Sequence, residues 1–190
     1  DPLTFAIASG PTNGTLSGYS NAALSGTVNW LGANLRGNLT VAADGILKLA
    51  SGYVHNVADC ALTNYGTVRW AGGTASGGGS SPNTKIYNYG TWESQCDAEI
   101  NNNTAGNGTF FYNSGVFTKS AGSGTNWIYS VPFHNTGSLE VQTGAVKLAY
   151  GGNLTGGSIS GTVLLSGGSF NLNGTETTTD VQLNGGSLSG

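Results

Sequence analysis

The chain has 190 residues and a formal net charge of −3, and only 8% of its residues are charged. It has no basic stripe, and no apolar run approaches the roughly 18 residues of a membrane span, so we expect neither a nucleic-acid partner nor a membrane-spanning segment. Glycine contributes 33 residues, but 37% are apolar and fall in short alternating runs, which is typical of an ordered, β-rich chain.

A phrase of glycine followed by an alternating apolar run returns along almost the whole chain. The glycines that open it are Gly14, Gly37, Gly66, Gly90, Gly115, Gly137, Gly161 and Gly186. Successive glycines are 23, 29, 24, 25, 22, 24 and 25 residues apart. A period in this range is the signature of a stacked-repeat protein. We expect these glycines to form corners, where the chain turns with φ > 0 and a Cβ would clash.

Short strands are expected between the corners, and no window shows the apolar spacing of a helix. In chain order the expected strands lie at 38–41, 46–49, 67–70, 86–88, 116–118, 127–129, 138–141, 145–148, 162–165 and 169–172. Two or three strands in each repeat of about 24 residues predict an all-β fold, a parallel β-helix of roughly eight coils. Nothing in the composition divides the chain, so 1–190 is predicted to be a single domain.

Alternation along these strands predicts which side chains point into the coil. The expected core includes Val68, Trp70, Leu139, Val141, Val146, Leu148, Val163, Leu165 and Phe170. The long interval from Gly37 to Gly66 and the stretch 72–82 are expected to bulge outward as loops. Asn-Gly pairs, such as those at 13–14 and 173–174, usually announce antiparallel hairpins and leave a sandwich or barrel as the alternative fold. The near-constant period favours the β-helix, because hairpins have no reason to keep it.

Cys60 and Cys96 are the only cysteines. Two cysteines in a lysine-poor chain fit one disulfide in an oxidising, extracellular setting. The alternative is a pair of free thiols. Asp1 is interpreted as a mature terminus after signal removal, or as the edge of a fragment.

Several phrases carry a resemblance to a known class of repeats. They are Asn64–Val68, Ile86–Thr91, Tyr112–Lys119 and Val131–Val141. They resemble the degenerate Asn-x-Gly-Thr-apolar repeats of large bacterial surface and secreted proteins, of the autotransporter-passenger and filamentous-adhesin type. The resemblance covers nearly the whole chain and implies a right-handed parallel β-helix with an adhesive, matrix or filament role. It implies no catalytic residue.

Enzymes with this fold need clusters of chemistry-bearing residues. The aspartate cluster and Gly-His-Gly motif of polygalacturonases are missing from the sequence. Asp97 and Glu99 are the nearest acidic pair, two residues apart and so on one face of a strand, but a solvated loop beside Cys96 is the plainer interpretation. The cysteines and histidines lack the ligand spacing of a zinc site. We therefore expect a protein that is not an enzyme and has no catalytic residues, metal or cofactor.

Aromatic residues are the better functional lead. Tyr65, Tyr87 and Tyr89 are candidates to stack on a sugar ring or on a partner subunit. Six Asn-x-Ser/Thr sequons mark candidate glycosylation sites, although a chain so rich in Asn, Ser and Thr contains several by chance. The sequon asparagines are Asn13, Asn38, Asn102, Asn107, Asn153 and Asn173.

These observations predict a non-enzymatic extracellular structural protein. Its coil ends would stack head-to-tail and form a surface filament, matrix fibre or adhesin stalk, because an uncapped β-helix end is an exposed strand edge. The alternative is a carbohydrate-binding or polysaccharide-cleaving β-helix module. Self-association is the expected partnership, and surface glycans are the other candidate partner.

Overall fold

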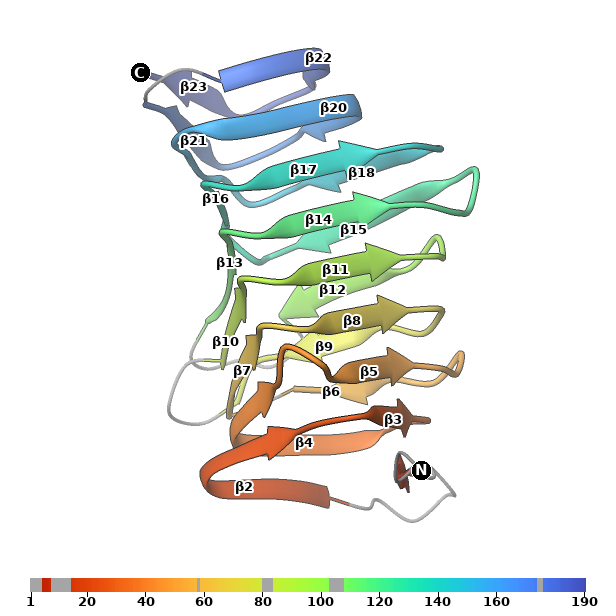
Figure 1. The fold of residues 1–190 in the computed structure, drawn as a ribbon. Helices are drawn as coiled ribbons and strands as arrows, with labels where there is room; N and C mark the ends of the chain where they lie inside the picture. Colours follow the sequence, from red (N-terminus) through yellow and green to blue (C-terminus); the bar gives the residue numbers. More distant parts are fainter. Residues whose placement is uncertain (1–4, 8–14, 58, 80–83, 103–107, 174–175) are drawn as a thin grey trace.

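The chain winds into an all-β parallel solenoid of about seven turns spaced about 22 residues apart. The computed structural model describes residues 5–7, 15–57, 59–79, 84–102, 108–173 and 176–190. Within these residues there is no helix, and every strand pairing is parallel. Figure 1 shows the turns stacked along one axis, with the chain ends at opposite ends of the stack. The predicted parallel β-helix is confirmed, while its right-handed winding stays a prediction.

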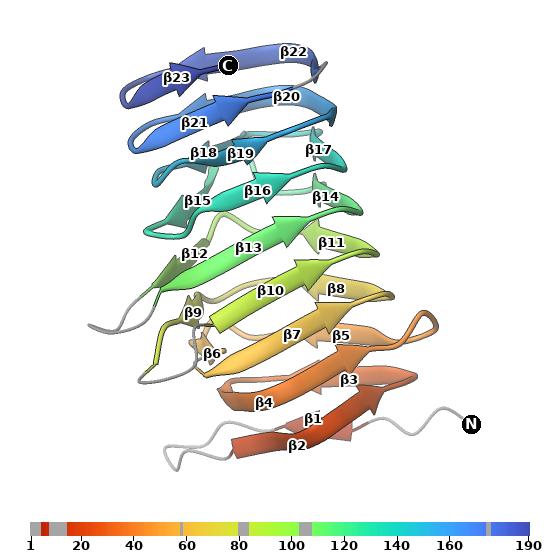
Figure 2. The ribbon, with the colours of Figure 1, turned by 90° about the vertical axis from the view of Figure 1, so that its left-hand side faces the viewer.

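Each turn contributes strands to three ladders, which we call A, B and C in the order in which the chain visits them (Figure 2). Ladder A contains β7 (Cys60–Asn64), β10 (Thr84–Asn88), β13 (Thr109–Asn113), β16 (Phe133–Asn135), β19 (Gly152–Leu154), β21 (Ser169–Leu172) and β23 (Ser187–Ser189). Ladder B contains β1 (Phe5–Ile7), β3 (Thr27–Trp30), β5 (Ile46–Leu49), β8 (Thr67–Trp70), β11 (Thr91–Ser94), β14 (Val116–Lys119) and β17 (Ser138–Val141).

Ladder C closes the coil. It contains β6 (His55–Asn56), β9 (Ala75–Gly77), β12 (Glu99–Asn102), β15 (Thr125–Tyr129) and β18 (Ala145–Leu148). Four longer strands bend through a corner and serve two ladders. They are β2 (Thr15–Leu24) and β4 (Ala33–Val41), which run from C into A, and β20 (Gly157–Leu165) and β22 (Glu176–Leu183), which run from B into C.

The core is a single column of apolar side chains inside the coil. All of the predicted core residues named above are buried, with Val141 the most exposed at 8%. The core residues could be predicted because side chains alternate along a strand, and β8 and β17 both bury every second side chain. Aromatic rings fill the centre of the stack, where Phe111 lies 5.2 Å from Phe133 in a stacked pair and 5.1 Å from Trp92 in an edge contact.

A column of buried asparagines runs along the corner between ladders A and B. The side-chain amides of Asn64, Asn88 and Asn113 each donate to the amide oxygen of the next asparagine at 2.7 Å, and the column ends at Asn135. The steps are 24, 25 and 22 residues. Leu154 occupies the next register position and cannot extend the column.

The second amide hydrogen of each asparagine satisfies a corner carbonyl. Asn64 donates to Thr91 O at 3.0 Å and Asn88 to Val116 O at 3.0 Å, each one turn further along the chain. A buried carbonyl without a partner would cost about 1–3 kcal/mol, so the asparagine column removes a penalty that recurs at every corner. Only the amide oxygen of Asn64, at the start of the column, is left without a partner, because Val41 precedes it in register.

The corner glycines beside this column are required for a reason other than the predicted one. Gly90 and Gly115 do not have positive φ. A Cβ at Gly115 would instead overlap the carbonyl oxygen of Gly90, and one at Gly90 would overlap that of Gly66. Close approach of successive turns therefore excludes a side chain. Gly137 continues the same column, whereas Gly37, Gly161 and Gly186 lie at other corners and do have positive φ, and Gly14 lies outside the described residues.

The expected outward loops are largely part of the coil. The interval from Gly37 to Gly66 contains the ladder strands β5, β6 and β7, and residues 75–77 of the second stretch form β9 with all three residues buried. The extra length arises because Gly37 and Gly66 are not in the same corner. Gly66 instead lies in the same corner as Gly45. A Cβ added to Gly66 would overlap the backbone oxygen of Gly45.

Candidate functional site

The three predicted tyrosines lie on the outer surface of ladder A and its corner, in two columns of parallel rings. Tyr65 stacks on Tyr89 with ring centroids 5.2 Å apart and 12° between planes. Tyr87 stacks on Tyr112 at 5.1 Å, and Tyr112 stacks on His134 at 4.9 Å. Tyr65 and Tyr89 are about half exposed, at 54% and 50%.

This packing limits what the tyrosine columns can bind. Parallel rings about 5 Å apart overlap face to face, so the neighbouring turn already covers a face of each ring. Tyr87 and Tyr89 lie side by side, with centroids 6.5 Å apart and 8° between planes. The columns therefore present mainly ring edges and hydroxyl groups. Stacking between turns makes them a stabilising feature of the coil as much as a binding surface.

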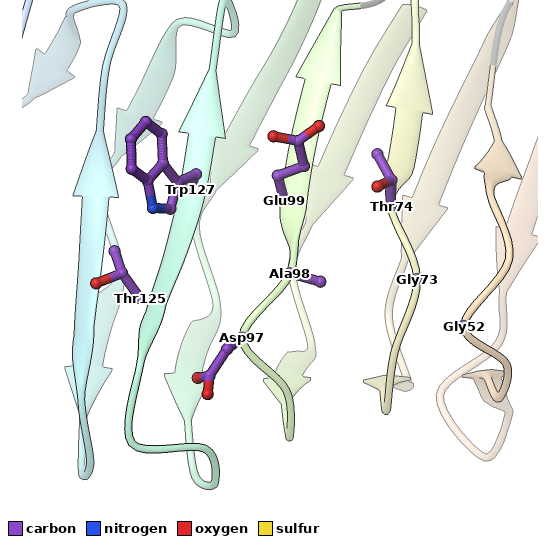
Figure 3. Close-up of a pocket in the computed structure, with 8 residues that line it drawn as sticks. All are labelled: Gly52, Gly73, Thr74, Asp97, Ala98, Glu99, Thr125 and Trp127. Atoms are coloured by element: carbon purple, nitrogen blue, oxygen red, sulfur yellow. The ribbon is translucent and has the colours of Figure 1, made fainter.

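The outer surface of ladder C carries a shallow, open groove. It has a volume of about 540 Å³ and is lined by Gly52, Gly73, Thr74, Asp97, Ala98, Glu99, Thr125 and Trp127. Figure 3 shows Trp127 and Glu99 side by side on neighbouring strands and Thr74 beside them, just before β9, with the side chains of Asp97 and Thr125 further along. The volume falls within the roughly 300–1,000 Å³ of small-molecule sites.

The order of the ladder sets this arrangement. Glu99 on β12 pairs in register with Trp127 on β15, and Trp127 pairs with Lys147 on β18. Because Ile100 and Ile128 are fully buried, alternation turns Glu99 and Trp127 outward. Trp127 is 42% exposed, whereas the other three tryptophans are buried.

Two cations flank the groove from different sides. Lys147 Nζ lies 4.1 Å from the centre of the Trp127 ring, a cation–π contact made from the turn beyond the groove. Lys119 is fully buried, and its Nζ donates to Asp97 Oδ1 at 2.6 Å and to the carbonyls of Cys96 and Ala121 at 2.9 Å. All three ammonium hydrogens thus have acceptors, which is how a buried charge is tolerated.

The two groove carboxylates differ in their partners. The hydrogen bond from Lys119, supported by one from Gly124 N at 3.0 Å, lowers the pKa of Asp97 and keeps it ionised. Glu99 accepts one hydrogen bond, from Asn101 Nδ2 at 2.6 Å. Within the described residues its second oxygen has no hydrogen-bond partner. The predicted acidic pair therefore shares one groove, but Asp97 is committed to Lys119.

The predicted disulfide between Cys60 and Cys96 is wrong, because both residues are free thiols. Cys60 begins β7 at the corner between ladders C and A, whereas Cys96 follows β11 at the corner between B and C in the next turn. The two residues thus lie at different corners. Burial raises the pKa of the Cys60 thiol to about 12, and it also raises that of Cys96.

Four of the six sequon asparagines lie in the described residues. Asn38, Asn153 and Asn173 are exposed and Asn102 is half-buried. The other two, Asn13 and Asn107, lie outside the described residues. Glycosylation at these positions stays a prediction.

No group of three or more His, Cys, Asp and Glu side chains in the described part of the chain gathers as a metal site. The described residues likewise contain no apolar helix of bilayer-spanning length.

Comparisons with protein-family models, with curated proteins and with solved structures find no match to this chain. The arrangement of the chain's own residues therefore carries the functional argument.

Two features of the structure, one buried and one on the surface, were not predicted from the sequence. The asparagine column was not predicted, although its signal is visible in the sequence as an asparagine two residues before glycine, at 64, 88, 113 and 135. Trp127 was not singled out. Its outward position could have been predicted from alternation around Ile128.

Proposed function

We propose that the chain is a non-enzymatic structural module of an extracellular surface or matrix protein, built into a filament, a matrix fibre or an adhesin stalk. The observation that carries this proposal is the continuity of the three ladders, which keep parallel register from turn to turn along the described chain. Such a stack makes contacts only between neighbouring turns, so it forms a rod whose length grows with the number of turns. A rod of this kind holds apart whatever lies at its two ends.

Exposed apolar side chains on β22 and β23 support assembly by end-to-end stacking. Leu183 on β22 and Leu188 on β23 are 49% and 46% exposed. An apolar rung with an open strand edge can accept another parallel rung by strand addition. The two ends of the coil differ, so the contact between two copies is head-to-tail and generates an open fibre. The resemblance to bacterial surface and secreted repeats supports the extracellular location.

Negative-stain electron microscopy across a concentration series tests the proposal. We expect rods that lengthen as the protein concentration rises, and we expect Leu188→Asp to stop elongation because it places a charge on the terminal rung. Tyr150→Asp is the matched control, since Tyr150 is equally exposed, at 55%, but follows β18 on the flank of the coil. Short rods of constant length at every concentration would contradict end-to-end assembly.

A further inference from the structure

We propose that the groove on ladder C binds a neutral oligosaccharide made of hexopyranose units, with one sugar stacked on Trp127 and its hydroxyls bonded to Glu99. This binding function goes beyond the structural role and does not depend on filament formation. Trp127 is the one tryptophan that is exposed among those described, and it lines the groove.

The indole ring of Trp127 contacts the Lys147 ammonium and also lines the groove. Lys147 lies on β18, the ladder C strand of the next turn, and does not line the groove. The groove residues lie on the same turn as Trp127 and on earlier turns, at and before β12. The apolar face of a pyranose ring fits an aromatic wall of this kind, in a site where a few polar groups fix orientation.

Hydrogen-bonding groups stand beside that wall. Glu99 is adjacent in register to Trp127 and carries a carboxylate oxygen without a partner in the described residues, so it can accept from sugar hydroxyls. Thr74 and Thr125 add hydroxyls on either side along the groove. Bonds to an ionised acceptor are stronger than neutral ones, which makes Glu99 the main polar contact.

The charges select a neutral ligand. The negative charge of Asp97 is balanced by the ammonium of Lys119, and the ammonium of Lys147 already lies over the Trp127 ring. Glu99 then sets the local charge, and it would repel the carboxylate of an acidic sugar. A compact organic cation would find the favourable indole contact already used.

The shape of the groove selects an oligomer. Its residues come from four successive turns, entering ladder C at Gly52, Gly73, Asp97 and Thr125. Three inter-strand spacings amount to about 14 Å, which is longer than a single sugar ring. Gly52 and Gly73 keep this floor low, and a Cβ at Gly52 would meet nothing within 4 Å.

Isothermal titration calorimetry with neutral hexasaccharides of glucose, mannose and galactose tests the proposal, with hexagalacturonate as the acidic counterpart. The titrations use the Leu188→Asp background, so that assembly cannot contribute. We expect at least one neutral hexamer to bind and hexagalacturonate not to bind. Trp127→Ala should weaken binding about tenfold or more, as is usual when an aromatic anchor is removed.

Two further variants keep the result interpretable. Gly52→Gln should abolish binding by filling the groove while leaving the thermal unfolding temperature unchanged, since its side chain enters open space. Tyr129→Ala is the matched control, because Tyr129 lies on the same strand and is 52% exposed but does not line the groove. No binding of any neutral hexamer, binding only of hexagalacturonate, or binding that survives both Trp127→Ala and Gly52→Gln would overturn the proposal.

Discussion

The middle turns and the last turns of this solenoid use the same three ladders but are held together differently. From β7 to β16 the turns step by 24, 25 and 22 residues, and each has a buried asparagine at the corner between ladders A and B. In the last turns the step falls to 18 residues. Leu154 and Leu172 replace asparagine there, and ladders B and C are served by one bent strand, β20 or β22.

The comparison shows that asparagine at the corner between ladders A and B occurs together with the longer turns. Both regions have a corner between A and B, but only in the longer middle turns do asparagine amides donate to the buried carbonyls of that corner. Buried polar groups without partners are costly, so the column stabilises the middle turns and also fixes their register. The turns that follow use the apolar residues Leu154 and Leu172 at the same position. We therefore expect the middle turns to be the most stable part of the coil.

Replacing an interior asparagine should have the largest effect. Asn113→Leu removes the acceptor of Asn88 and leaves Asn135 Oδ1 and Ser138 O without their donor. We expect the free energy of unfolding to fall by about 3–5 kcal/mol, measured by urea denaturation. Asn135→Leu, at the end of the column, should cost about half as much. The exposed Asn173→Leu is the control, and an equal loss in all three variants would refute the column.

Adding a methyl group at the corner between ladders A and B should cause the next largest loss of stability. Gly115→Ala places a Cβ against the backbone oxygen of Gly90, and the turns would have to separate to admit it. We expect a loss of about 3 kcal/mol in thermal or urea unfolding. Gly52→Ala, where a Cβ meets open space, should change stability by less than about 0.5 kcal/mol. Similar losses at both positions would show that turn contact is not the cause.

The buried ion pair should contribute less, because Asp97 is 40% exposed. Asp97→Asn leaves the Lys119 ammonium buried without its counter-ion, and we expect a loss of about 2 kcal/mol. Lys119→Met in the same chain should recover part of this loss. A double variant no more stable than Asp97→Asn alone would contradict the pairing.

The same pair makes stability depend on pH in a known direction. The pKa of Asp97 is lowered in the folded state by the Lys119 hydrogen bond, so its contribution is present above the ordinary aspartate pKa of about 3.9 and is lost as the pH falls through the folded value. The acid limb of the unfolding profile should therefore be shallower in Asp97→Asn. An unchanged acid limb would contradict this assignment.

Adding a reducing agent should have the smallest effect on the unfolding temperature. Because both cysteines are free, dithiothreitol should not shift the unfolding temperature, and two thiols should titrate after denaturation without reductant. In the native protein Cys60 should remain unreactive because it is buried and its pKa is about 12. A chain that shows no thiols until it is reduced would restore the disulfide that the sequence suggested.

Sequence patterns predicted what depends on local periodicity. The inward positions of Val68, Leu139 and Phe170 follow from alternation alone, and the glycine period predicted the solenoid. Features that depend on which turns meet were harder to predict. The cysteines could not be placed at corners without the register, and the reason for Gly115 is a contact with the previous turn rather than its own φ.

Part of the candidate surface could likewise be predicted from the sequence. The tyrosines were predicted only as candidates to stack on a ligand or partner; Tyr65 and Tyr89 are exposed, but their mutual stacking depends on turn spacing. The groove requires residues from four turns to come into register, and single-strand patterns contain no such information. The outward position of Trp127, by contrast, was within reach of alternation around the buried Ile128.

Amide hydrogen exchange followed by NMR tests the central claim, that the asparagine column makes the middle turns the most stable part of the rod. We predict that the slowest-exchanging backbone amides lie in β10, β13 and β16, and that the side-chain amides of Asn88 and Asn113 are protected with them. Backbone amides of β22 and β23 should exchange first. Uniform protection along the coil, or rapidly exchanging asparagine side chains, would contradict the claim.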